Sequence, residues 1–151
     1  MVEATEAKRN TQAAEAVVRG VSRLMHNLDE TCLSEFTLKT GRRVDIIALD
    51  RKGVFTVVEV KTSVADFRAD GKWREYLDFC DRFYFAVPTA FPAGILPSEC
   101  GLMVADGYGS EILRASPQGG MNASRRKALT LRFARTAATR LMRLNDPPPG
   151  S

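Results

Sequence analysis

The sequence has few of the residues that build disulfide-bonded or zinc-binding domains. Its 151 residues include three cysteines, Cys32, Cys80 and Cys100, at wide spacings, and one histidine, His26. An odd number of scattered cysteines excludes a disulfide framework and the paired ligands of a structural zinc site. A histidine without a second histidine or a cysteine as partner indicates a packing or surface residue. This cysteine usage fits a reducing cytoplasm.

Long apolar runs and glycine-rich phosphate loops are also absent. No stretch approaches the roughly 18 consecutive apolar residues of a membrane-spanning helix. Residues 1–10 carry charged side chains where a signal peptide would have its apolar core. Neither a GxGxxG nor a GxxxxGK[ST] segment occurs, which argues against a small-molecule enzyme that binds nucleotides. We therefore expect a soluble, cytoplasmic protein with no membrane partner.

What the sequence contains is the composition of one globular domain. Hydrophobic residues make up 44% and charged residues 26% of the chain, within the range of folded proteins. At roughly 150 residues per domain, a single domain over residues 1–145 is expected. Residues 146–151, which include three consecutive prolines, are expected to form a disordered tail.

Positive charge is concentrated near the C-terminus. The net charge is +4, yet residues 124–143 alone hold seven Arg and Lys residues and no Asp or Glu. Such a segment either contacts a polyanion or forms a solvated helix face, and the composition leaves both readings open.

The first half of the chain predicts one helix followed by three strands. Apolar residues recur at helical spacing from Ala14 to Leu28, after a cap at Asn10 or Thr11. Runs rich in Val, Ile, Phe and Thr then predict an antiparallel meander over 31–38, 43–49 and 54–61.

The second half predicts a helix, a strand, a hairpin and a last helix. The helix should run from Ser63 or Asp70 to Cys80, although Gly71 could break it near its start. Its inward stripe consists of Trp73, Tyr76, Leu77 and Cys80. A buried strand over 83–87, an accessory hairpin over 101–105 and 110–115, and a helix from a cap at Ser124 to about Met142 follow. The order αβββαβ predicts an α/β domain with a mixed central sheet flanked by helices.

Charged residues interrupt two strands that otherwise read as buried. Asp45 lies in the second strand, and Glu59 and Lys61 lie in the third. A buried charge without a partner costs several kcal/mol, so these groups should be paired, bind a metal or face a cleft.

The register of this hairpin follows from its turn. A three-residue loop over 51–53, with Gly53 in the left-handed conformation, pairs Asp50 with Val54. The same register places Asp45 opposite Glu59, on the face that also carries Lys61. The opposite face carries a core of Val44, Ile46, Val58 and Val60.

Two opposed carboxylates indicate a bound cation. They repel each other unless one is protonated or a cation lies between them, and oxygen ligands favour Mg²⁺ or Mn²⁺. Lys61 would orient a water molecule or neutralise charge that develops on a phosphate. The alternative is an ion-pair network at the solvent edge of a sheet. Glu15 lies at the edge of the first helical stripe, where it either reaches a cleft or is solvated.

These residues resemble the PD-(D/E)XK nuclease superfamily. Asp45 is followed on the next strand by Glu59-Val60-Lys61, between two helices. The resemblance implies a restriction-endonuclease-like fold and a metal-dependent phosphodiesterase. It further implies that Asp45, Glu59 and the Val60 carbonyl bind the metal and that Lys61 serves the attacking water. Glu15 would match a glutamate that many members add from the first helix.

More narrowly, most of the segment from Thr11 to Ala115 is similar to the MmcB family of bacterial DNA repair proteins, and the most specific part of this resemblance lies between Arg42 and Pro88. The matching segments are Arg43-Val-Asp-Ile, Val58-Glu-Val-Lys-Thr, Asp66-Phe67, Asp70-Gly-Lys72-Trp73, Tyr76, Cys80-Asp81 and Tyr84-Phe85-Ala-Val-Pro88. The resemblance implies a nuclease-like protein linked to tolerance of DNA damage. Many nuclease relatives add a polar residue from the second helix, and Lys72 is the nearest candidate.

The last helix presents a basic stripe. At 100° per residue, its cations Arg125, Arg132, Arg140 and Arg143 fall on one side. Such a stripe predicts contact with the DNA backbone. An apolar set, Leu131, Ala134, Ala138 and Leu141, is available to dock the helix or a partner subunit. Homodimers are common for the resembled fold, so a second copy or another repair protein stays a candidate partner.

Two hypotheses result. The first is a Mg²⁺- or Mn²⁺-dependent endonuclease that hydrolyses phosphodiester bonds of branched, damaged or ordinary DNA during repair. The second is a non-catalytic DNA-binding or adaptor subunit of a repair complex, whose carboxylates bind a structural ion or none.

Overall fold

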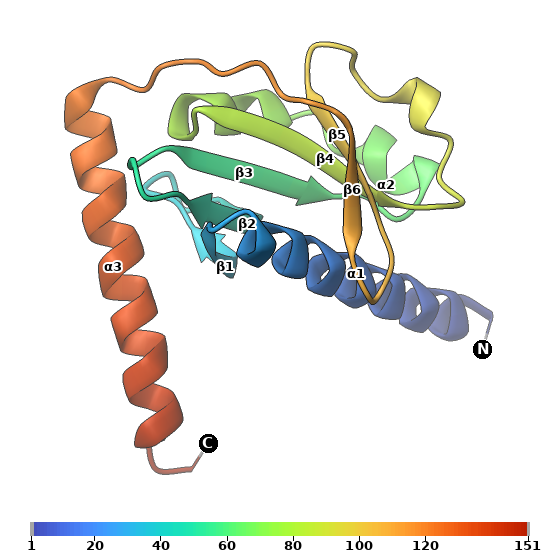
Figure 1. Ribbon diagram of the computed structural model, residues 1–151. Coiled ribbons are helices and arrows are strands. Elements are labelled where there is room, and N and C mark those ends of the chain that lie inside the picture. Colours follow the sequence, from blue (N-terminus) through green and yellow to red (C-terminus); the bar gives the residue numbers. More distant parts are fainter. Residues whose placement is uncertain (1, 151) are drawn as a thin grey trace.

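The computed structural model describes residues 2–150 as one mixed β-sheet with helices on both faces (Figure 1). In chain order the elements are α1 (Val2–Asn27), β1 (Thr31–Thr37), β2 (Arg43–Leu49), β3 (Phe55–Val60), α2 (Val64–Ala69), η1 (Trp73–Phe79), β4 (Arg82–Pro88), η2 (Ala93–Ile95), β5 (Gly101–Ala105), β6 (Ser110–Arg114) and α3 (Ala123–Asn145), where η denotes a 3₁₀ helix. None of the helices within residues 2–150 has the length and apolar character needed to cross a bilayer.

The strands lie in the order β1-β2-β3-β4-β5-β6 within a six-stranded sheet of the described chain. The predicted antiparallel meander is confirmed for β1 to β3, and the predicted parallel pairing is confirmed between β3 and β4. The hairpin expected to be accessory is part of the same sheet, because β5 pairs in parallel with β4. The observed order α1-β1-β2-β3-α2-β4 is the αβββαβ order of the prediction.

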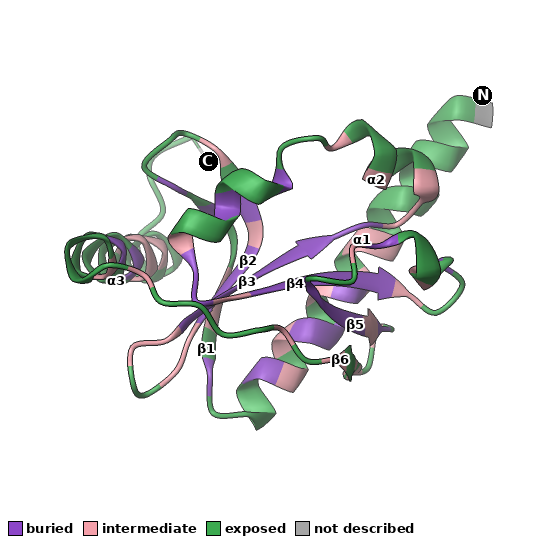
Figure 2. Ribbon diagram, turned by 90° about the horizontal axis from the view of Figure 1, so that it is seen from above, coloured by how far each residue is buried: buried purple, intermediate pink, exposed green. Residues whose placement is uncertain are grey.

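Both faces of the sheet are buried, which corrects the expectation that only one face is a core. Helix α1 covers one face, where Val17 and Val21 pack with Val58. Elements η1 and α3 cover the other face, where Trp73 and Phe133 join a second cluster. All six residues of β3 are buried, and the central strands in Figure 2 are correspondingly purple. The carboxylate pair therefore lies at the end of a second core.

The regular alternation of side chains breaks near that end. Val44 packs in the same cluster as Ile47, three residues further along β2, so it does not share a face with Ile46 as predicted. On the neighbouring strand Glu35 has a left-handed φ of 48°, which is uncommon for a residue other than glycine. The irregularity therefore affects both β1 and β2 at the level of Asp45.

The helices differ from prediction at their ends. Helix α1 begins at Val2, well before the cap expected at Asn10 or Thr11. The predicted second helix is split into α2 and η1 around Gly71, and Leu77 is 43% exposed instead of buried. Asn122 caps α3 in place of Ser124, because its side-chain oxygen accepts a hydrogen bond from the Arg125 N–H at 2.8 Å.

The buried apolar contacts of helix α3 come from its first half. Leu129 and Phe133 are buried, and the Phe133 ring lies 5.9 Å from that of Phe55. The predicted docking residues Leu131 and Leu141 are instead 62% and 60% exposed. The second half of α3 extends past the sheet (Figure 1).

Gly20 permits close contact between α1 and the β5–β6 turn, so Gly20→Ala is expected to destabilise the protein by about 2 kcal/mol. An added Cβ would collide with the backbone carbonyl oxygens of Asp106 and Gly109. Helix propensity alone predicts the opposite sign, a gain of about 1 kcal/mol. Urea unfolding measures the difference, with exposed Asn10→Ala as the control for propensity. Unchanged or raised stability of Gly20→Ala would contradict this packing.

Candidate active site

Asp45 and Glu59 meet where β2 and β3 separate. The antiparallel ladder runs from Leu49 opposite Phe55 to Ile46 opposite Val58, which confirms the register predicted from the turn at Gly53. Gly53 has the expected positive φ, 85°. The ladder ends one pair before the carboxylates, so the predicted apposition of Asp45 and Glu59 holds through their side chains and not through backbone pairing.

Each carboxylate accepts a hydrogen bond from a backbone N–H of the facing strand, as a backbone carbonyl would in a regular ladder. Oε1 of Glu59 accepts a hydrogen bond from the Asp45 N–H at 3.0 Å. Oδ2 of Asp45 accepts one from the Val60 N–H at 2.8 Å. This reciprocal arrangement places both acids at fixed positions and brings the Val60 backbone against the pair.

Burial and mutual repulsion make the pair resist ionisation. Glu59 is only 5% exposed. Burial and then the charge of Asp45 raise the pKa of Glu59 to about 8. Burial also raises the pKa of Asp45, against the opposing effects of the Val60 N–H and Lys61. Without a cation, the pair therefore retains a proton near neutral pH.

Lys61 lies beside the pair with its side chain 7% exposed. Its Nζ donates a hydrogen bond to Oδ2 of Asp70 at 2.8 Å. The second oxygen of Asp70 accepts from the Lys72 N–H at 3.0 Å. Although burial opposes ionisation of Asp70, these bonds hold its pKa below the ordinary value. Asp70 thus fixes the position of the ammonium group.

The sequence reasoning did not assign Asp70 to the site. The sequence offered two signals for Asp70: its place in a segment that resembles the MmcB family, and its position just before Gly71, where the second helix is interrupted. Asp66 was missed as well, and its negative charge contributes to the raised pKa of Asp45. Both residues come from the segment that follows β3 and reach the site only because this segment folds back.

Glu15 and Lys72 are not brought into the pair. Glu15 is exposed on α1. Within residues 2–150, no three His, Cys, Asp or Glu side chains gather closely enough to hold a metal ion, so Glu15 does not complete a triad with Asp45 and Glu59. Lys72 is exposed, and only its backbone takes part, through Asp70.

The donor set fits a hard divalent cation with few protein ligands. Two adjacent carboxylates whose ionisation is suppressed gain from a bound cation that neutralises both. Mg²⁺ is usually held by one or two carboxylates, with waters and substrate phosphates completing its octahedron. Asp45 and Glu59 would supply the carboxylates, and the Val60 carbonyl would supply a further oxygen.

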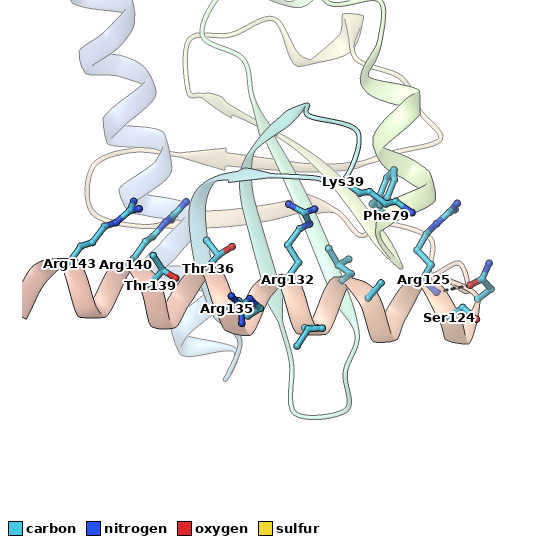
Figure 3. A pocket seen from close by; sticks show the side chains of 14 residues that line it. Lys39, Phe79, Ser124, Arg125, Arg132, Arg135, Thr136, Thr139, Arg140 and Arg143 are labelled. Carbon is cyan, nitrogen blue, oxygen red and sulfur yellow. Dashed lines mark hydrogen bonds between the residues drawn. The ribbon is translucent and has the colours of Figure 1, made fainter. Parts of the chain in front are cut away.

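A second feature is a groove of about 940 Å³ between α3 and the body of the domain (Figure 3). Its lining includes all four α3 cations predicted to bind DNA, Arg125, Arg132, Arg140 and Arg143, but not Lys72. Lys39 in the β1–β2 turn and Phe79 at the end of η1 line the opposite side.

Not every cation of α3 faces this groove. Arg126 points inward and forms a two-pronged ion pair with buried Asp81, at 2.6 and 2.7 Å. The basic segment therefore combines an arginine that is paired with a buried carboxylate and cations that line the groove or face solvent.

Comparisons with known proteins identify relatives of this chain. A solved protein of unknown function from Silicibacter pomeroyi is 42% identical over 92% of this chain and 95% of that chain, with a TM-score of 0.87. None of the curated proteins is significantly similar. A model of the family described as DNA repair protein MmcB-like matches residues 2–148. Because this match covers the sheet, the carboxylate pair and α3 together, the chain belongs to the family of MmcB-like DNA repair proteins.

Proposed function

We propose that this protein is a Mg²⁺- or Mn²⁺-dependent endonuclease of the PD-(D/E)XK type that hydrolyses phosphodiester bonds of DNA during repair. The observation that carries the proposal is the reciprocal pairing of Asp45 and Glu59 with Lys61 beside them. The family description supports the connection with DNA repair.

The proposed roles follow from the positions of the groups. Asp45, Glu59 and the Val60 carbonyl would hold the metal, which when bound lowers the pKa of a coordinated water and polarises a phosphoryl oxygen. The Lys61 ammonium group lies next to the carboxylates with little exposure to solvent, where it can orient a water or stabilise charge on a phosphate. Asp70 acts as a positioning residue for Lys61. The α3 cations would contact the DNA backbone.

The decisive experiment combines metal binding with cleavage. Isothermal titration of Mn²⁺ should give binding for wild type and for Lys61→Ala, and none for Asp45→Ala. Cleavage of branched, gapped and duplex DNA with Mn²⁺ should be lost in Asp45→Ala and fall at least about 100-fold in Lys61→Ala, because Lys61 acts on the reacting groups. Cleavage by Lys61→Ala at the wild-type rate would contradict its role.

A non-catalytic adaptor is the second candidate. It is favoured because, among the described residues, no three acidic side chains lie close enough together to share a metal ion. An adaptor would show salt-sensitive DNA binding that survives Asp45→Ala and fails when Arg132, Arg140 and Arg143 are neutralised. Wild type could bind DNA, fail to bind Mn²⁺ even when DNA is present, and cleave none of the substrates. This outcome would replace the nuclease assignment by the adaptor assignment.

A further inference from the structure

We propose that the groove between α3 and the body of the domain binds single-stranded DNA, and that the protein therefore recognises DNA with an unpaired segment. This inference takes the identity of the polyanion from the proposed function. It does not depend on catalysis, because the groove is built by residues other than the carboxylate pair.

The charge of the groove calls for an anionic ligand. Its cationic lining consists of Lys39, Arg125, Arg132, Arg135, Arg140 and Arg143, and no Asp or Glu lines it. Within residues 2–150, the side chains of Lys39, Arg132, Arg135 and Arg143 make no hydrogen bond or ion pair. Like charges gathered around one concave surface repel each other, so a ligand with regularly spaced negative charges would be drawn to it.

The groove is bounded by contacts that fix α3 relative to the body. At one end Arg125 donates to the Asp78 carbonyl at 3.2 Å and lies over the Phe79 ring, 5.0 Å from its centroid. Toward the other end Arg140 donates to the carbonyls of Ser34 and Glu35 in β1, at 2.6 and 2.8 Å. Figure 3 shows Arg132 between these two contacts, with its guanidinium turned toward the body. The site is therefore preformed.

The apolar part of the lining distinguishes a single strand from a duplex. Phe79, Ala128 and Leu131 contribute apolar surface between the cations. Unpaired bases can stack on the Phe79 ring and pack against the aliphatic side chains, whereas a duplex buries its base faces in its own stack. A rigid duplex also presents a convex surface, which fits poorly into a groove of about 940 Å³.

The position of Lys39 connects the groove with the candidate active site. Lys39 lies in the turn that joins β1 to β2, just past the last pair, Thr37 with Arg43. Asp45 is two residues along β2 from Arg43, or about 7 Å at the rise of a strand. The Arg43 side chain is 63% exposed. A strand that leaves the groove past Lys39 would thus approach the carboxylate pair.

The test is binding of fluorescein-labelled DNA, followed by anisotropy in EDTA so that no cleavage occurs. We expect a 12-nucleotide oligothymidine to bind at least about 10-fold more tightly than a blunt 12-base-pair duplex. Arg132→Glu should weaken binding of the single strand at least about 10-fold. Lys127→Glu is the matched control, because it makes the same charge change on an exposed position of α3 outside the groove, and it should weaken binding less than about 3-fold.

A second variant separates stacking from charge. Phe79→Leu keeps an apolar side chain but removes the flat ring, and it should weaken binding of the single strand several-fold without affecting the duplex. Equal affinity for both DNAs, or equal losses in Arg132→Glu and Lys127→Glu, would overturn the inference. Groove-dependent binding without cleavage of any substrate would refute the proposed nuclease alone. Metal-dependent cleavage with no preference for the single strand would refute this inference alone.

Discussion

Replacing Glu59 by Gln is expected to abolish metal-dependent cleavage and at the same time to stabilise the metal-free protein at pH 8. The amide keeps an oxygen that can accept the hydrogen bond Glu59 now receives from the Asp45 N–H. It removes the negative charge that burial and Asp45 disfavour. The same charge is what a divalent cation requires, so function and metal-free stability should change in opposite directions.

The sign of the pH dependence follows from the raised pKa. Glu59 ionises at about 8 in the folded protein but near its ordinary value of about 4.3 in the unfolded chain. Between these values the folded state binds a proton that the unfolded state has lost, so stability falls by up to about 1.4 kcal/mol per pH unit as pH rises. This contribution is complete below about pH 4 and is lost above about pH 8. The Gln variant should lack this slope.

Urea unfolding in EDTA at pH 5.5, 7 and 8.5 measures the stability of the metal-free protein. DNA cleavage with Mn²⁺ measures the loss of activity. Glu111→Gln is the matched control, because Glu111 is exposed on β6 and its substitution makes the same charge change. Saturating Mn²⁺ should stabilise wild type and leave Glu59→Gln unaffected. The assignment fails if Glu59→Gln retains the pH slope of wild type or still cleaves DNA.

Removing the Asp81 carboxylate with Asp81→Ala is expected to cost about 3 kcal/mol of folding free energy. The side chain is 2% exposed and accepts four hydrogen bonds. Two come from Arg126 and the others from the backbone N–H groups of Phe55 and Met121. Alanine would leave a guanidinium and two N–H groups without their partner. The expected loss of folding free energy is at the lower end of the range for broken buried ion pairs, because the Arg126 side chain is 31% exposed.

The contacts of Asp81 also predict how stability depends on pH. Although burial opposes ionisation of Asp81, Arg126 and the two N–H groups lower its pKa. The stability it contributes is therefore present above the ordinary pKa of an aspartate and is lost as pH falls through the lower folded value. Asp81→Ala should flatten the acid limb of the stability profile.

Asp78→Ala is the control for this variant, since Asp78 is exposed three residues away and carries the same charge. Thermal and urea unfolding should show little change for Asp78→Ala and a large loss for Asp81→Ala. Because Asp81 links the start of α3 to β3, binding of single-stranded DNA should fall together with stability. Equal stability of the two variants would show that this anchor contributes little.

Local patterns predicted the centre of the candidate site. A turn that needs a left-handed residue at Gly53 sets the register of β2 and β3, and this register brings Asp45 and Glu59 to the same level where the ladder ends. The helix and strand order followed in the same way from periodicity. These features depend on residues close in the chain, whose geometry is restricted by backbone sterics.

Only the tertiary structure decided which side chains that are distant in sequence become partners. Nothing local shows that Asp70 meets Lys61 after the break at Gly71, or that Arg126 is used by Asp81 while Arg132 faces solvent. The sequence alone determined a basic helix and a carboxylate pair. How α3 docks depends on which of its apolar residues fit the sheet, and that choice created a groove which no periodicity predicts.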